Sequence, residues 1–206
     1  MPYHHGHLRE ALISAAMATA RAEGPDAVVL RAVTRAAGVT PNAAYRHFAD
    51  RDQLVGVVAA RCLERLFELI ELRLSEVAAD PDPVALAWQR LRVAGSAYVE
   101  FALSEPGWFR TAFGATRPAD PATTPDEGPA TTPAARNPLT LLNTILDDLV
   151  AAGALPKGRR RGAEYAAWSA VHGIATLLVD GPLADIPGAD RVQIVNKVID
   201  VVAAGI

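Results

Sequence analysis

The chain has 206 residues, half of them hydrophobic, which is enough for one large domain or two small ones. A net charge of −3 argues against non-specific coating of nucleic acid, and the single cysteine, Cys62, excludes an internal disulfide and fits a reducing compartment. The sequence has neither a long uncharged apolar run nor a signal peptide, so we expect a cytoplasmic protein without a transmembrane helix. Its abundance of alanine and leucine predicts an all-α fold.

The chain begins with a predicted helix from His7 to Ala22, which Gly24-Pro25 ends. Two short helices joined by a tight turn are predicted at about 29–48. The first covers residues 30–37, and Gly38 is expected to close it in the left-handed conformation. The second runs to residue 48. This is a helix–turn–helix, whose second helix can enter a DNA major groove.

The second helix of the motif has a clear start. Thr40 is a good N-cap, and Pro41 occupies the first helical position, where a missing N–H costs nothing. Asp50 is expected to cap the next helix, with Gln53 as its capping-box partner. An ordinary helical bundle can also contain such a motif, so spacing alone leaves a protein that does not bind DNA as an alternative.

Side chains of the motif that cannot join its small apolar core stay available to a partner. Asn42 and Arg46 are four apart, and we expect them to contact base edges, arginine preferring guanine and asparagine adenine. Other residues are expected to hold phosphates or to lie against the groove. The complete predicted DNA-binding set is Thr40, Asn42, Ala43, Tyr45, Arg46, His47 and Arg51.

The run GVTPNAAYRHFADRDQL at 38–54 resembles the recognition segment of the tetracycline-repressor (TetR) family of bacterial transcription regulators. Residues 5–24 resemble the first helix of that family. The pattern departs at Ala44, where a larger aliphatic residue is more usual, and at Thr34, where alanine is common. The resemblance implies a DNA-binding domain over 1–56 and a helical regulatory and dimerisation domain over 57–206. It further implies a palindromic double-stranded operator and, most often, repression.

The remaining chain is predicted to be helical with one interruption. Expected helices cover Arg51 to about Ala78, 83–104, 139–152, 160–179 and 190–204, with a short aromatic turn or helix at 108–113. Residues 115–138 are low in complexity and contain six prolines, so they are predicted to form a mobile loop. A tolerated insertion is the favoured explanation of this loop.

Aromatic residues of the middle helices predict an apolar cavity, the usual form of a small-molecule site, although a filled core fits them almost as well. Few charges lie among them, so the ligand is expected to be apolar. Trp168, His172 and Gly173 resemble a Trp…His-Gly pattern in one branch of TetR-family regulatory domains; a hydrogen-bonded core histidine is the alternative. The predicted ligand-binding residues are Trp88, Phe101, Trp108, Phe109, Phe113, Ile145, Trp168 and His172.

The last two helices are strongly apolar on one face and need a partner. The resemblance implies that they meet their copies in a four-helix homodimer interface, and a twofold dimer also suits a helix–turn–helix. Burial within the chain is the alternative. The expected interface residues are Val171, Leu178, Val192, Val195, Ile199 and Val202.

Enzymatic function is not indicated. The sequence has no nucleophile elbow, phosphate loop, dinucleotide fingerprint or metal quartet, so no catalytic residue, metal ligand or cofactor is predicted. His4, His5 and His7 match the usual start of the TetR family better than a metal site. The chain is predicted to be a sequence-specific DNA-binding transcription regulator, a repressor released by a small apolar ligand. A helical protein–protein adaptor without DNA binding is the competing class.

Overall fold

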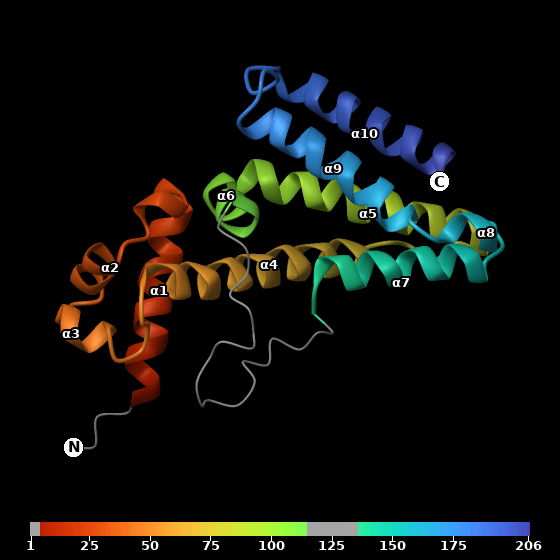
Figure 1. The fold of residues 1–206 in the computed structure, drawn as a ribbon. Helices are drawn as coiled ribbons and strands as arrows, with labels where there is room; N and C mark the ends of the chain where they lie inside the picture. The colour runs from red at the N-terminus through yellow and green to blue at the C-terminus, as the bar shows by residue number, and fades with distance from the viewer. Residues whose placement is uncertain (1–4, 115–135) are drawn as a thin grey trace. The chain divides into compact units, whose positions relative to one another are not determined.

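The computed structural model describes residues 5–114 and 136–206, and every regular element within these ranges is a helix (Figure 1). The predicted all-α fold is confirmed. The described chain divides into two compact units. The head unit contains residues 5–63 and 105–114, and the body unit contains residues 64–104 and 136–206. Helix α4 (Arg51–Ser75) runs through the boundary between them.

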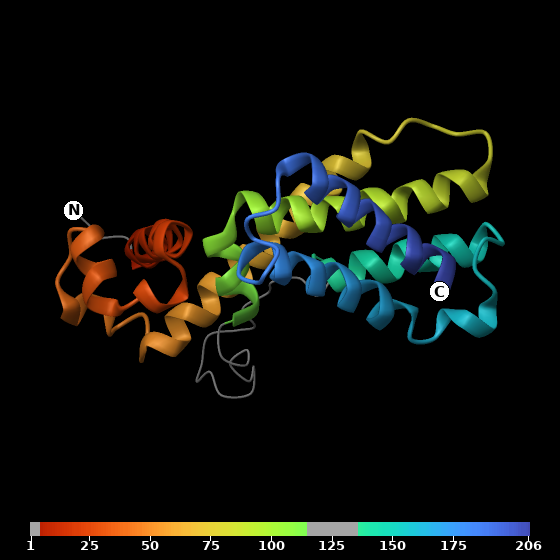
Figure 2. The same cartoon turned by 90° about the horizontal axis from the view of Figure 1, so that it is seen from above.

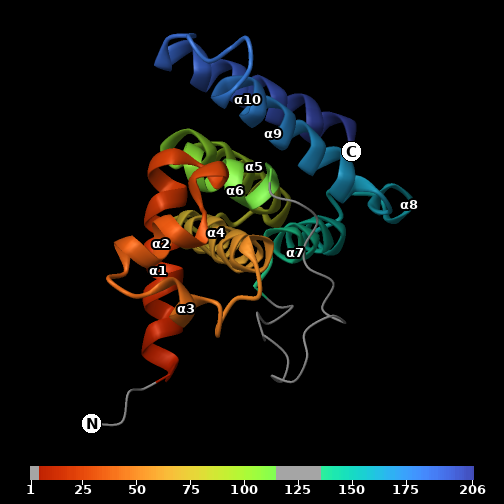
Figure 3. The same ribbon diagram turned by 60° about the vertical axis from the view of Figure 1, so that its left-hand side comes forward.

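The head unit contains α1 (His5–Glu23), the 3-10 helix η1 (Pro25–Ala27), α2 (Leu30–Ala36), α3 (Pro41–Ala44), the start of α4 and α6 (Pro106–Gly114). Figure 3 brings α1, α2 and α3 to the front. Their small apolar core is sealed from solvent, because Leu12, Val33, Leu54 and Val58 are all fully buried. The sequence predicted α1 and α2 to within two residues but did not predict η1.

The turn of the helix–turn–helix has the predicted backbone. Gly38 has a φ of +69°, the left-handed conformation that favours glycine after a helix. Thr40 occupies the N-cap position in extended geometry, although its side chain makes no capping hydrogen bond. Pro41 is the first residue of α3, as predicted. The predicted extent of this helix to residue 48 is wrong, since α3 ends at Ala44 and residues 45–47 form a turn.

The end of α3 places Phe48 in the core of the head. The Ala44 carbonyl accepts both from His47 N at 2.9 Å and from Phe48 N at 3.0 Å, which tightens the last turn. Phe48 is 1% exposed, so the tightened backbone accompanies the burial of its ring. The predicted capping box of α4 is present: Gln53 N donates to Asp50 Oδ1 at 2.8 Å. Gln53 Oε1 accepts from Ala49 N at 2.7 Å, one residue before the expected donor.

Cys62 lies in the head unit on α4. Its side chain is fully buried, with Sγ 3.9 Å from the Sδ of Met17. Burial is the main cause that raises the pKa of this thiol to about 12, and the carboxylate of Glu105 adds to it. The thiol is therefore protonated and packs as a small apolar group.

The body unit contains the rest of α4, α5 (Pro83–Ser104), α7 (Pro138–Ala151), α8 (Lys157–Arg160), α9 (Ala163–Val179) and α10 (Gly188–Gly205). Helix α5 contacts α7, α9 and α10, and α9 also lies along α10 (Figure 2). Gly95 allows the close approach of α5, because a Cβ there would meet Ile199 Cδ1 at 3.2 Å and Val171 Cγ1 at 3.4 Å. The bounds of α5 are those predicted from the sequence.

Two differences from the predicted elements occur around α7 and α8. Most of the predicted loop at 115–138 lies outside the described residues, but Asn137 caps α7 through its side chain and Pro138 begins that helix. The short α8 was not predicted. Gly162, with a φ of +86°, separates α8 from α9, so the helix expected from residue 160 begins at Ala163.

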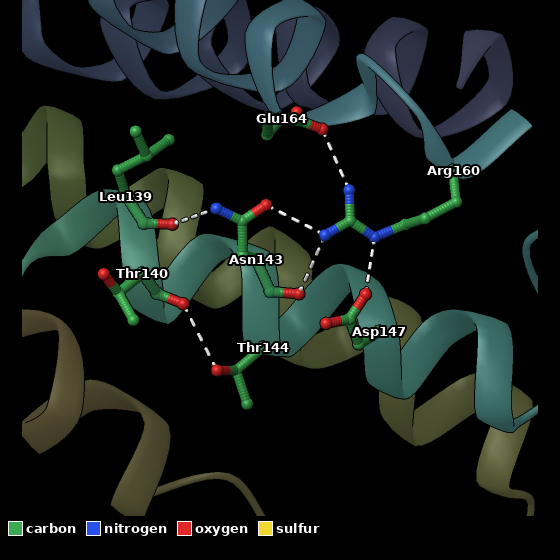
Figure 4. Close-up of polar contacts among 7 residues, drawn as sticks. All are labelled: Leu139, Thr140, Asn143, Thr144, Asp147, Arg160 and Glu164. Atoms are coloured by element: carbon green, nitrogen blue, oxygen red, sulfur yellow. Dashed lines mark hydrogen bonds and ion pairs between the residues drawn. The ribbon is translucent and has the colours of Figure 1, made fainter. Parts of the chain in front are cut away.

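An arginine network joins three helices of the body unit (Figure 4). Arg160 donates from Nε to Asp147 at 2.7 Å, from Nη1 to Glu164 at 2.9 Å and from Nη2 to the Asn143 side chain at 2.8 Å. The Asn143 amide in turn donates to the Leu139 carbonyl. The guanidinium thus connects α8 with α7 and α9, and both carboxylates are used in packing.

Candidate nucleic-acid interface

The exposed side of the motif carries most of the predicted DNA-binding residues. Thr40, Asn42, Tyr45 and Arg46 are exposed, whereas Ala43 and His47 are half-buried. Tyr45 is 55% exposed, a large value for an aromatic side chain. The buried Ala44 shows that the opposite side of α3 faces the core. The short helix therefore presents a polar surface with one aromatic ring.

Arg51 differs from the other predicted contacts because it is already bound within the head. Its Nη2 donates to the Pro25 carbonyl at 2.7 Å, and its guanidinium lies 3.9 Å from Asp26 and 3.6 Å from Asp52. These contacts tie the start of α4 to η1. They leave the side chain 37% exposed.

A surface hollow of about 360 Å³ lies beside Tyr45. It opens between the starts of α2 and α4 and the turn that follows α3. Apolar and phenolic groups share its lining with the guanidinium groups of two arginines and with one carboxylate, that of Asp50, which caps α4. The lining residues are Val29, Leu30, Arg31, Tyr45, Ala49, Asp50 and Arg51.

Arginines without an anionic partner gather on the motif. Arg31 and Arg35 are exposed and lie four apart on α2, so they share one helix face. Like Arg46, they make no side-chain hydrogen bond or ion pair within residues 5–114 and 136–206. Elsewhere in these ranges, Arg90 and Arg161 are also unpaired.

Most other described arginines are paired with carboxylates. Arg73 binds Glu100 at 2.6 Å, and Arg92 binds Asp200 at 2.9 Å. Three of the five described arginines that have no side-chain partner therefore lie on the helix–turn–helix, and Arg90 and Arg161 lie in the body together with the unpaired Lys157 and Lys197. Our sequence prediction missed Arg31 and Arg35, although their spacing on the first helix of the motif was a visible signal.

The predicted ligand-binding residues fall into two groups. Trp108, Phe109 and Phe113 lie on α6 of the head unit, where Phe109 is 3% exposed and its ring centre is 5.2 Å from that of Phe113. The body unit holds the other five: Trp88, Phe101, Ile145, Trp168 and His172. Phe101 and Ile145 are buried, at 3% and 1% exposure, and the others are half-buried.

Trp168 and His172 of the body unit surround the phenol of Tyr98. Tyr98 Oη lies 2.8 Å from His172 Nδ1, and Trp168 Nε1 lies 3.3 Å from the same oxygen. Burial raises the pKa of the phenol and lowers that of the imidazole. Trp168 Nε1 donates to the Tyr98 oxygen, and the Tyr98 hydroxyl and His172 Nδ1 share a hydrogen bond. Sequence reasoning placed Tyr98 among the middle aromatics but did not include it in the site.

The single chain already buries half of the predicted dimer interface. Leu178, Val195 and Ile199 are 2%, 7% and 5% exposed, because their side chains face the interior of the body unit. Val171 and Val202 are half-buried, and Val192 is 60% exposed. On the outer sides of α9 and α10, Leu177 and Val201 are 41% and 58% exposed, and Ile194 and Val198 are half-buried.

The buried core of the helix–turn–helix and the unpaired arginines on its outer side place this chain in the class of helix–turn–helix proteins. Residues 12–58 match the model of the bacterial regulatory proteins of the tetR family. Residues 91–202 match the model described as the tetracyclin repressor-like C-terminal domain. The chain therefore belongs to the TetR family of bacterial regulatory proteins, and its N-terminal helix–turn–helix is the DNA-binding part of that family.

Solved structures support the same fold. A protein of unknown function from Rhodococcus sp. RHA1 is 29% identical, with a TM-score of 0.73 and coverage of 100% of this chain and 98% of that chain. FadR from Bacillus subtilis, solved in complex with stearoyl-CoA, is 16% identical, with a TM-score of 0.66 and coverages of 96% and 98%. PfmR from Thermus thermophilus is 19% identical, with a TM-score of 0.62 and coverages of 94% and 97%. No curated protein matches the chain.

Neither a membrane-spanning helix nor a metal-binding cluster is found among the described residues. Among the helices in these ranges, none is both long enough and apolar enough to cross a membrane. Within the same ranges, no cluster of three or more histidine, cysteine or acidic residues is placed to hold a metal ion.

Proposed function

We propose that the protein is a cytoplasmic, sequence-specific transcription regulator that binds a palindromic DNA operator as a homodimer. The observation that carries this proposal is the set of unpaired cations on the exposed side of the motif. Unpaired arginines can replace the counterions of phosphates without first breaking an ion pair. The net charge of −3 limits non-specific binding, so selectivity must come from the contacts of the motif.

Asn42 and Arg46 are the proposed base-reading residues, because both are exposed on α3 and the turn after it and have no side-chain partner among the described residues. Thr40, Ala43, Tyr45 and His47 are proposed to lie against the sugar–phosphate backbone. We assign one strand of the backbone to the hollow beside Tyr45, with Arg31 contacting a phosphate from α2. Arg51 contributes its partly exposed guanidinium while it keeps its bond to the Pro25 carbonyl.

The proposed dimer interface is the outer side of α9 and α10. Leu177 and Val201 carry most of the exposed apolar surface there, and the half-buried Ile194 and Val198 lie on the same side of α10 as Val201. Their burial against a second copy removes this surface from water, which favours association. Leu178, Val195 and Ile199 are left out of this interface because the chain's own helices cover them.

The proposed mode of action is repression that a small apolar ligand relieves. The proposed ligand contacts are the body residues Trp168, His172, Phe101 and Ile145, whereas Trp88 is left out because it lies about 20 Å from Phe101 along α5. A Trp…His-Gly pattern at 168–173 supports this assignment to one branch of the family. FadR from Bacillus subtilis was solved with stearoyl-CoA, which joins a long apolar acyl chain to a charged CoA group, and this supports the idea that a protein of this fold can hold an apolar chain. Trp108 and Phe109 are omitted because they pack within the head.

Selection of DNA from a random duplex pool by the purified full-length protein tests the proposal. The expected result is enrichment of an inverted repeat whose half-sites are separated by about one helical turn, because a twofold dimer presents two motifs. A helical adaptor would enrich no sequence. Enrichment of a single half-site without symmetry would contradict the dimeric mode and leave DNA reading intact.

A further inference from the structure

Helix α6 belongs to the head unit although it follows α5 of the body unit in sequence. One residue, Glu105, separates the end of α5 at Ser104 from the start of α6 at Pro106. Helix α6 contacts α1 and η1. The head unit therefore includes a helix that a domain boundary at residue 56 leaves out.

Side chains from both helices join α6 to the second half of α1. Arg21 donates from Nε at 2.6 Å and from Nη2 at 2.5 Å to the two oxygens of Glu105, a bidentate pair. The same guanidinium lies 5.0 Å from the centre of the Trp108 ring, within cation–π distance. Trp108 Nε1 donates to the Met17 carbonyl at 2.9 Å. Each contact constrains the orientation of α1.

The backbones of the two helices also meet at Gly107. A Cβ at this position would lie 2.3 Å from the carbonyl oxygens of both Ala20 and Arg21. Backbone atoms cannot rotate aside as a side chain does, so any larger residue at 107 must push α6 away from α1. Phe109 and Thr111, at 3% and 0% exposure, complete the buried side of α6.

Helix α1 also contacts the recognition segment. The guanidinium carbon of Arg9 lies 5.5 Å from the centre of the Phe48 ring, directly after the turn at 45–47. Helix α1 contacts α2 as well. Because α1 is one continuous helix from His5 to Glu23, its contacts with α6 and with Phe48 are carried by a single stiff element.

We infer that Arg21, Glu105, Gly107 and Trp108, here named the α1–α6 clamp, are positioning residues for DNA binding. The clamp holds α1, which packs against the buried Phe48, in the orientation in which α3 presents its polar side to the operator. The clamp lies directly after the point where the chain passes from the body unit to the head unit, between Ser104 and Glu105. This inference rests on the proposed DNA-binding function.

The glycines of α6 supply a matched pair for the test. Gly107→Ala inserts a methyl group against backbone, whereas a Cβ at Gly114 has no neighbour within 4 Å. Binding to the duplex selected by the wild type is measured by fluorescence anisotropy, at a temperature where circular dichroism shows each variant fully folded. We expect Gly107→Ala to bind about tenfold more weakly or worse. Its preference for the selected duplex over a scrambled one should also fall. Gly114→Ala should match the wild type.

A double-mutant cycle tests the ionic contact of the clamp. Arg21→Met and Glu105→Gln should each weaken binding of the selected duplex, and the double variant should be no weaker than the poorer single variant, because both remove one contact. Fully additive losses would show that the two residues act separately and would contradict the clamp.

The outcomes separate this inference from the proposed function. If the wild type enriches no duplex, the DNA-binding function fails and the role of the clamp falls with it. If the wild type binds its selected duplex and folded Gly107→Ala binds it with unchanged affinity and preference, only the clamp is refuted. An equal loss in Gly114→Ala would also refute it, because the effect would then not depend on the close approach to α1. Amide hydrogen exchange gives an independent measurement. We expect the amides of α1 to exchange faster in Gly107→Ala than in Gly114→Ala, because α1 is displaced only in the first variant.

Discussion

The arginine side chains of this protein fall into two groups, those that form an ion pair with a carboxylate and those that do not. Arg73 and Arg92 are paired on the surface of the body, and such exposed pairs contribute little to stability. In the head unit, Arg31, Arg35 and Arg46 have no carboxylate partner among the described residues and stay available to an approaching phosphate. The distribution of partners, more than the number of arginines, distinguishes this surface.

At Arg46, replacement by alanine should remove a base contact. We expect operator binding to weaken by roughly 1–3 kcal/mol and the preference at one position of each half-site to relax. Binding-site selection with the variant measures both effects. Arg161→Ala is the matched control, since Arg161 is exposed and unpaired within the described part of the body. An unchanged preference in Arg46→Ala would show that Arg46 does not read a base.

Arg31→Ala should weaken DNA binding in a different way from Arg46→Ala. A phosphate contact carries no sequence information, so its loss should weaken binding to selected and scrambled duplexes by similar factors. The slope of log K against log salt concentration should decrease by about 1. Titrations at several salt concentrations give this slope. A loss confined to the selected duplex would instead assign Arg31 to base reading.

His172 makes the stability of the body depend on pH. Because burial lowers its pKa in the folded state below the ordinary value of 6.5, the unfolded chain binds the proton more readily. The free energy of unfolding should therefore fall as pH decreases below about 6.5. His172→Gln should reduce this dependence in urea titrations at different pH, whereas His7→Gln on the exposed side of α1 should retain it. Identical pH profiles for His172→Gln and the wild type would contradict the assignment.

At the scale of elements, helices whose ends are marked by proline could be predicted from the sequence, and very short helices could not. Pro83 and the Glu105-Pro106 pair delimit α5, and its predicted bounds are confirmed. Helix α8 has only four residues, too few to show an apolar period, and lies between Pro156 and Gly162. The early end of α3 depends on the burial of Phe48, a tertiary effect that local propensity does not contain.

The cap of α4 allows a quantitative test. Asp50→Ala removes the acceptor of Gln53 N, and we expect a loss of about 1 kcal/mol in the unfolding free energy. Asp52→Ala is the control, because Asp52 lies in the first turn of the same helix without capping it. Urea denaturation followed by circular dichroism measures both variants. Equal losses would point to a general charge effect at the helix start instead of a cap.

At the scale of the whole molecule, the sequence predicted the class of protein and the position of the helix–turn–helix along the chain. The side of α10 that faces its own chain could not be predicted, because this helix has apolar residues on both sides. Val195 and Ile199 form the inner side, and Val198 and Val201 lie on the outer side. Periodicity detects an apolar face but does not tell whether the chain or a second copy covers it.

Dimerisation can be tested by charge on either side of α10. Val201→Glu should give a folded monomer, because position 201 is solvent-exposed in the single chain and buried charge disfavours only the association. Val195→Glu should unfold the body, since Val195 is 7% exposed. Analytical ultracentrifugation and circular dichroism distinguish these outcomes. A dimeric Val201→Glu of unchanged affinity would place the interface elsewhere.

The burial of Cys62 makes it easier to measure the distance between the recognition segments of the two protomers in solution. Thiol reagents attack the thiolate, and a fully buried thiol with a pKa of about 12 supplies almost none at neutral pH. The native chain should resist Ellman's reagent and react only after denaturation. A single cysteine introduced at an exposed site of the head could then carry a spin label or fluorophore without prior removal of the natural one. The distance between two such labels in a dimer would report directly on how far apart the DNA-reading surfaces stand.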